Sequence, residues 1–259
     1  MIDCNFWKGT PETTPSELYP DLEKWPEYLK RAFLGLSSET LFEEEQNEAT
    51  KRKKEWVLEI RRDDLIEKEI LRNYPTVYVG SGTDIEFPIL LGARNIIMVD
   101  PIFESKEAID IVKQKIVNII GSEDITITEE EIDSKISTVF EFKIGEETYI
   151  VKLVPAYYGL KKIQEREIRL PRRSLEIENK EEHTEHLLEF HPPENIGLLL
   201  GFLPTFYIDD DPETIKRIVP GGYILSTGKP QSELSGYTPI KLKCEGESGN
   251  YTFLKKEGN

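Results

Sequence analysis

Short runs of consecutive apolar residues recur along the chain, and the segments between them have the spacing of helices or the composition of turns. The apolar runs cover residues 76–80, 95–100, 196–203 and 219–225. Continuous runs of this length predict strands that are buried on both faces of a parallel sheet. Residues 105–120 have apolar positions every three or four residues and are predicted to form a helix. The alternation of strands and helices predicts an α/β protein.

Two further pairs of segments predict hairpins. Residues 138–144 and 148–154 flank a short glycine turn, which is typical of antiparallel neighbours. The second arm of this hairpin is expected to run into the sheet as its third central strand. Near the end of the chain, residues 240–244 and 251–254 are predicted to form a terminal hairpin.

The N-terminal part has helical spacing without apolar runs. Residues 27–36 and 38–73 are predicted to be helical. In the second segment an inward apolar stripe is expected from Leu58, Ile60, Leu65, Ile66, Ile70 and Leu71. The basic run Lys51–Lys54 is interpreted as a solvated helix face. Residues 1–74 are therefore predicted to form a helical cap on the rest of the protein.

The most informative chemical pattern lies around the first two predicted strands. Gly80-Ser81-Gly82 follows the first strand, and Asp100 ends the second. Such glycines let the backbone turn sharply beside a ligand, and an acid at this spacing can accept hydrogen bonds from ribose hydroxyls. The pattern predicts a Rossmann-type nucleotide site in residues 75–259, with a charged insertion at about 160–192 over the ligand edge. A strand-to-helix turn without a ligand is the alternative interpretation.

Asp84 indicates which nucleotide is favoured. It is expected at or near the N-cap of the helix after the glycine turn, where its carboxylate would occupy free backbone donors and repel an anion. The third small residue of a dinucleotide fingerprint is also missing, because Ile85 stands in its place. The pattern therefore favours S-adenosylmethionine, an adenosine with a sulfonium cation and an amino-acid tail, over NAD.

Charge and composition restrict the kinds of molecule that the protein is expected to bind. The formal net charge of −16 argues against a broad nucleic-acid surface and against contact with anionic membranes. Cys4 and Cys244 are the only cysteines, so neither a disulfide framework nor a thiolate metal site is expected. Without a recognisable signal peptide or membrane-spanning run, a soluble cytoplasmic protein is expected. The many Glu, Lys and Ile residues favour a thermophilic source.

The three histidines are His183, His186 and His191. The first two would share a face of a helix, so a metal site with nearby glutamates is one interpretation, and a general base is another. The segment lacks thiolates and has the composition of a solvated helix. No bound metal is therefore predicted.

The motifs together resemble those of class I S-adenosylmethionine-dependent methyltransferases. They are Gly80-Ser81-Gly82, Asp100 and the run Val219-Pro220-Gly221-Gly222-Tyr223-Ile224-Leu225, which resembles the proline-diglycine turn before that family's fifth strand. The resemblance covers roughly residues 75–256. It implies a Rossmann-like methyltransferase fold, with a central, mostly parallel seven-stranded sheet and an antiparallel C-terminal hairpin.

The resemblance also implies roles for individual residues toward S-adenosylmethionine. The backbone of Gly80, Ser81 and Gly82 would line its methionine part, while Asp84 would pair with its amino group or sulfonium. Asp100 would bind the ribose hydroxyls. The residues expected around the adenine and the transferred methyl group are Pro101, Ile102, Tyr157, Gly201 and Phe202. No catalytic acid or base is assigned, because in-line methyl transfer mainly requires that donor and acceptor be positioned.

Several positions depart from the family pattern. Tyr78 stands where the family often has an acid, Asp84 occupies the third glycine position, and no acid follows the third strand at Pro155-Ala156-Tyr157. The main hypothesis is a methyltransferase acting on an unidentified acceptor. A non-catalytic binding or scaffold protein and an aminopropyltransferase-like enzyme are the alternatives, with an NAD-dependent oxidoreductase third. The oligomeric state is open, and a homo-oligomer is compatible with the sequence.

Overall fold

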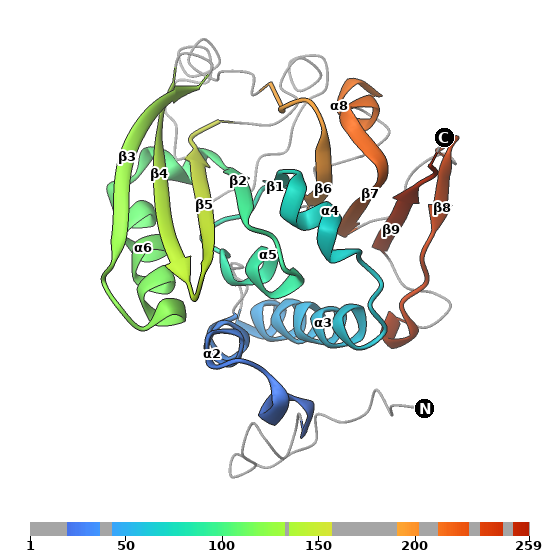
Figure 1. Ribbon diagram of the computed structural model, residues 1–259, viewed down its shortest axis with the longest axis horizontal. Coiled ribbons are helices and arrows are strands. Elements are labelled where there is room, and N and C mark those ends of the chain that lie inside the picture. Colours follow the sequence, from blue (N-terminus) through green and yellow to red (C-terminus); the bar gives the residue numbers. More distant parts are fainter. Residues whose placement is uncertain are drawn as a thin grey trace.

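The computed structural model describes residues 20–36, 43–132, 135–156, 191–201, 212–227, 234–245 and 251–258. In this part of the chain nine strands form one mixed sheet in the order β3-β4-β5-β2-β1-β6-β7-β9-β8 (Figure 1). The strands are β1 (Thr76–Val79), β2 (Asn95–Val99), β3 (Ile125–Ile132), β4 (Lys135–Ile144), β5 (Glu147–Val154), β6 (Ile196–Gly201), β7 (Ile218–Thr227), β8 (Tyr237–Pro239) and β9 (Tyr251–Lys256).

Helices precede the sheet and connect its strands. The described α-helices are α2 (Glu27–Gly35), α3 (Glu43–Arg62), α4 (Lys68–Asn73), α5 (Glu86–Leu91), α6 (Lys106–Ile120) and α8 (Pro212–Arg217). The described 3-10 helices are η1 (Pro20–Lys24), η2 (Pro101–Glu104) and η5 (Lys243–Glu245).

Five parallel strands form the centre of the sheet. Their order in the sheet is β5-β2-β1-β6-β7. When these five strands alone are numbered along the chain, this is the Rossmann order 3-2-1-4-5. The residues of β1 and β6 are all buried, which is why these strands are continuous apolar runs. The strand β9 pairs antiparallel with β7. The predicted Rossmann-like methyltransferase fold is therefore confirmed.

The sheet is larger than the seven strands that the resemblance implies. The additional strands β3 and β4 extend it beyond β5, and both of their pairings are antiparallel. The predicted hairpin of residues 138–144 and 148–154 is confirmed, and β5 runs parallel to β2 as its second arm.

The predicted C-terminal hairpin is wrong in one arm. Residues 240–244 were expected as a strand, but the strand that pairs with β9 is β8, and Lys243 lies in η5. The backbone N–H groups of Lys243 and Cys244 donate instead to the buried carboxylate of Glu59 in α3, at 2.6 and 2.9 Å. Because these donors are bonded to a helix side chain, they are unavailable for a strand ladder.

The long helical segment predicted for residues 38–73 is split. The helix α3 ends at Arg62, Asp64 has a positive φ of 46°, and α4 begins at Lys68. The six apolar residues of the predicted stripe nevertheless all belong to, or pack against, the main core cluster.

The N-terminal helices share this core with the sheet. The cluster joins Phe33 of α2 and Trp56 of α3 to Tyr78 and Met98 of the central strands. Figure 1 shows α2 and α3 beside α5. Two arginines from these helices also donate to the last carbonyls of their neighbours, Arg31 to Ile120 at 3.3 Å and Arg61 to Leu90 at 2.7 Å. Cations placed at helix C-termini in this way stabilise the packing.

Candidate functional site

The loop between β1 and α5 has the backbone conformation that its glycines predict. Gly80 and Gly82 have φ values of 59° and 51°, in the left-handed region that favours glycine. The Gly80 N–H donates to the carbonyl of Val99 at 2.9 Å, which ties the loop to the end of β2. A Cβ added to Gly82 would meet no atom of the described residues within 4 Å. The backbone at Gly82 therefore faces open space, into which a ligand can approach closely.

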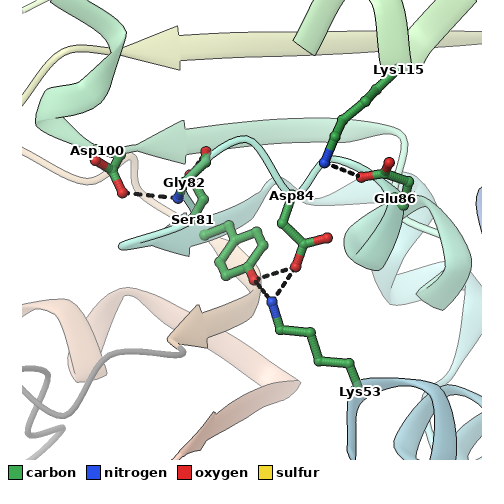
Figure 2. A network of polar contacts seen from close by, with 8 residues as sticks. Lys53, Ser81, Gly82, Asp84, Glu86, Asp100 and Lys115 are labelled. Atoms are coloured by element: carbon green, nitrogen blue, oxygen red, sulfur yellow. Dashed lines mark hydrogen bonds and ion pairs between the residues drawn. The ribbon is translucent and has the colours of Figure 1, made fainter. Parts of the chain in front are cut away.

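Asp100 connects this loop to the segment after β2. One carboxylate oxygen, Oδ2, accepts a hydrogen bond from the Gly82 N–H at 2.9 Å (Figure 2). The other, Oδ1, accepts one from the Ile102 N–H at 3.0 Å. The second bond makes Asp100 the N-cap of η2. Each carboxylate oxygen can accept more than one hydrogen bond, and Asp100 is partly exposed. A partly exposed carboxylate of this kind is a suitable acceptor for ribose hydroxyls.

The residues after Asp100 divide between surface and core. Ile102 is 39% exposed, whereas Phe103 is buried in the main core. The resemblance implies that Pro101 and Ile102 border the adenine. Ile102 presents an apolar surface beside Asp100, and Phe103 belongs to the core.

Gly201 is the last residue of β6 and lies between Val79 of β1 and Ser226 of β7 in the strand register. It is therefore next to the start of the glycine loop. Tyr157 and Phe202, the other residues predicted near the adenine and the methyl group, lie outside the described residues.

Asp84 lies near the N-cap of α5, as its sequence position predicts, but its carboxylate does not cap the helix. The N-cap of α5 is Ile85, and no side chain caps this end. Asp84 is 4% exposed, and its carboxylate turns into the protein interior, where it forms an ion pair with Lys53 of α3 (Figure 2). The Tyr78 hydroxyl donates to the same Asp84 oxygen at 2.9 Å. A carboxylate whose charge is compensated in this way repels an anion less than a free N-cap carboxylate would.

Lys53 also corrects the interpretation of the basic run Lys51–Lys54 as a solvated face. The Lys53 side chain is buried, and its ammonium donates to the Tyr78 hydroxyl at 3.2 Å. It lies 5.8 Å from the centroid of the Phe87 ring. Lys54 is partly buried over the Phe33 ring, and burial lowers its pKa. Four consecutive residues span a full helical turn, so at least one of them must face the sheet when the helix packs on it.

The Tyr78 hydroxyl is hydrogen-bonded to both charged groups, the Lys53 ammonium and the Asp84 carboxylate. Burial raises the pKa of its phenol well above the ordinary value, and the nearby Asp84 raises it further. The hydroxyl is therefore neutral, so it can donate to Asp84 while it accepts from Lys53. The other Asp84 oxygen, Oδ1, is buried without a hydrogen-bond partner among the described residues.

The two departures from the family pattern in this loop thus contact one another. Tyr78 replaces an acid and Asp84 replaces a glycine, and the structure joins them with a single hydrogen bond. Their unusual identities were visible in the sequence. Their contact with Lys53 was not, because no spacing rule connects residue 53 to residue 84.

A second buried ion pair lies close by. Glu86 of α5 is 2% exposed and lies 3.2 Å from the ammonium of Lys115 in α6 (Figure 2). Burial raises the pKa of Glu86 to about 7, since the lowering by Lys115 only partly offsets it and Asp84 adds to the rise. The side chain of Glu86 therefore changes its charge near neutral pH.

The described residues contain no group of three or more His, Cys, Asp or Glu side chains arranged to hold a metal ion. His183 and His186 lie outside the described residues. In the part of the chain that the structure covers, no helix is long and apolar enough to cross a membrane.

Comparisons with known proteins find similar solved structures, among them one from Haemophilus influenzae and one from Geobacter sulfurreducens. No protein-family model and no curated protein matches the chain. A candidate methylase from Haemophilus influenzae is 10% identical, with 80% of this chain and 99% of that chain covered and a TM-score of 0.40. A methyltransferase from Geobacter sulfurreducens is also 10% identical, with 78% and 87% covered and a TM-score of 0.35. The fold assignment rests on the strand order of the chain itself.

Proposed function

We propose that this chain binds S-adenosylmethionine at the ends of β1 and β2 and transfers its methyl group to an acceptor. The observation that carries the proposal is the pairing of Gly82 with Asp100. The Asp100 carboxylate holds the Gly82 N–H at 2.9 Å, and the Gly82 backbone faces open space. This places a partly exposed carboxylate beside a loop that a ligand can approach closely, at the ligand edge of a Rossmann-like sheet.

The described residues fit the cofactor in this arrangement. The backbone of Gly80, Ser81 and Gly82 would hold its methionine part, and Asp100 would accept hydrogen bonds from its ribose hydroxyls. Pro101 and the exposed Ile102 would border the adenine. When bound, the cofactor supplies a methyl group on a sulfonium, which is electrophilic without a catalytic acid. The protein contributes positioning and exclusion of water.

The positions around the transferred methyl group are proposed from the resemblance. Gly201, which lies beside Val79 at the end of β6, supports this part of the proposal because it ends its strand next to the glycine loop. Tyr157 and Phe202 would complete the same region. The acceptor would be a small molecule or a macromolecule other than broadly bound nucleic acid, in view of the net charge of −16.

A second candidate function is nucleoside binding without turnover. The ion pair of Lys53 with Asp84 favours it, since Asp84 does not need a ligand cation to compensate its charge. Calorimetry with S-adenosylmethionine, S-adenosylhomocysteine and NAD, together with an assay for methyl transfer into cell extract, separates the two functions. Binding without transfer would favour the second.

The binding proposal is tested with Asp100→Ala and with Asp110→Ala as the control, because Asp110 is an exposed acid on α6. Loss of charge-assisted hydrogen bonds, each worth about 1.5–3 kcal/mol, should weaken S-adenosylhomocysteine at least about tenfold in the first variant. The control should bind like the parent. If the parent binds no adenosine ligand at millimolar concentration, the proposal is wrong.

A further inference from the structure

We propose that Lys53 is a positioning residue of the ligand site, which braces the Gly80–Thr83 loop from its two ends. The proposal rests on the proposed function, because the loop is the part of the site that would hold the ligand. It assigns to α3 a role in ligand binding that no motif in the sequence indicates.

The first argument is the placement of the three side chains. Tyr78 belongs to β1 and precedes Gly80 by two residues, and Asp84 follows Gly82 by two residues. The ammonium of Lys53 contacts both, through the ion pair with Asp84 and the 3.2 Å hydrogen bond to the Tyr78 hydroxyl. A single cation from another element therefore joins the strand before the loop to the residue after it.

The second argument is burial. The side chains of Lys53 and Asp84 are 5% and 6% exposed, so water cannot replace either partner. Removal of one member of a buried ion pair leaves an uncompensated charge, which is far more unfavourable than removal of both members. Because Oδ1 of Asp84 has no hydrogen-bond partner among the described residues, the contacts with Lys53 and Tyr78 are what hold this carboxylate.

The third argument is that α3 is itself held in place on its other side. The Trp56 indole N–H donates to Glu245 at 2.7 Å, and Glu59 accepts from the backbone of Lys243 and Cys244. The helix is therefore fixed between the C-terminal segment and the glycine loop. Lys53 acts on the ligand through the loop, without contact to the ligand itself.

The experiment uses the full chain and compares Lys53→Met, Asp84→Asn and the double variant. Lys115→Met is the matched control, since Lys115 is another largely buried lysine in an ion pair, with Glu86. For each protein, calorimetry gives the Kd for S-adenosylhomocysteine, amide hydrogen exchange gives the protection of the Gly80–Thr83 loop, and urea unfolding gives the stability.

Lys53→Met should raise the Kd at least about tenfold and accelerate exchange of the Gly82 N–H, because the loop loses its brace. The double variant should regain stability relative to Lys53→Met, because Asp84 no longer leaves an unpaired buried charge. Its Kd and loop exchange should stay close to those of Lys53→Met, because the contact that joins the two ends of the loop is still missing. Lys115→Met should lower stability while Kd and loop exchange stay at the parent values.

Equal Kd and equal loop exchange in Lys53→Met and Lys115→Met would overturn the proposal and leave Lys53 a role in stability alone. Recovery of the parent Kd and loop exchange in the double variant would also overturn it, because the effect of Lys53→Met would then come from the unpaired Asp84 charge and not from the lost contact between the two ends of the loop. If Lys53→Met does not fold, Asp84→Asn and the double variant give the same comparison. If the parent binds no adenosine ligand, the proposed function fails, while loop exchange still decides whether Lys53 braces the loop.

Discussion

Gly82 and Gly145 have similar backbones, with φ values of 51° and 62°, and in the part of the chain that the structure describes a Cβ added to either would meet no atom within 4 Å. They differ in place, because Gly82 belongs to the proposed ligand loop and Gly145 to the β4–β5 turn. An alanine at either position should cost roughly 1–2 kcal/mol of stability, since a left-handed backbone is unfavourable for a residue with a Cβ.

The two alanine variants should differ in ligand binding. Gly82→Ala should weaken S-adenosylhomocysteine at least about tenfold, because its new methyl group would occupy the space that the ligand approaches, whereas Gly145→Ala should bind like the parent. Urea unfolding and calorimetry measure the two effects. Equal affinities in the two variants would contradict the placement of the ligand at Gly82.

The structure changes the effect on ligand affinity that is expected from a substitution at Asp84. If Asp84 faced the ligand sulfonium, its loss would weaken S-adenosylmethionine more than S-adenosylhomocysteine, which lacks that charge. In the structure Lys53 already compensates its charge. We therefore expect Asp84→Asn to weaken both ligands by the same factor, as measured by calorimetry. A selective loss of the sulfonium ligand would show that Asp84 senses ligand charge after all.

At the scale of elements, α3 connects regions that are far apart in sequence. Its Glu59 carboxylate accepts from the backbone N–H groups of Lys243 and Cys244, and burial together with Glu59 raises the pKa of the Cys244 thiol. Glu59→Ala removes two hydrogen bonds to a charged group and leaves two backbone donors unpaired. It should lower the free energy of unfolding by about 3 kcal/mol in urea titration.

Glu48→Ala is the control for this prediction, because Glu48 lies on the exposed side of the same helix. Its stability should stay within about 0.5 kcal/mol of the parent, as is usual for surface substitutions. Similar losses in both variants would mean that helix propensity, and not the contact with η5, explains the effect at Glu59.

At the scale of the whole molecule, Glu86 couples folding to pH. Its pKa is about 7 in the folded protein and 4.5 in its reference state, so between these values the native state binds more protons than the unfolded state. Stability from this group is therefore present near pH 4.5 and is lost as the pH rises through 7.

Glu86→Gln should remove this dependence. The free energy of unfolding of the variant relative to the parent should rise between pH 5 and pH 8 by roughly 1–3 kcal/mol. Urea titrations at both pH values measure it. A difference that is constant with pH would mean that Glu86 has an ordinary pKa in the folded protein.

Local patterns were sufficient for the central architecture. The apolar runs predicted β1, β2, β6 and β7, because a strand that is buried on both faces must be apolar throughout. The 3.6-residue period predicted α6, and the glycines predicted the positive φ values of the loop after β1. These features depend on residues that are close in sequence. Residues 125–132 of the edge strand β3 and residues 240–244 were less predictable. Whether such residues form a strand depends on their pairing with segments that are distant in sequence.

The sequence by itself determined the Rossmann-like sheet, the glycine turn and the acid that ends β2. Only the tertiary structure decided which charged side chains are buried and which groups they pair with. Lys53 in a basic run and Asp84 at a helix start both suggested solvent or a ligand, yet they meet in the interior with Tyr78. The physical reason is that the cost of burying a charge depends on its partner, and that partner comes from a helix whose packing no local pattern specifies.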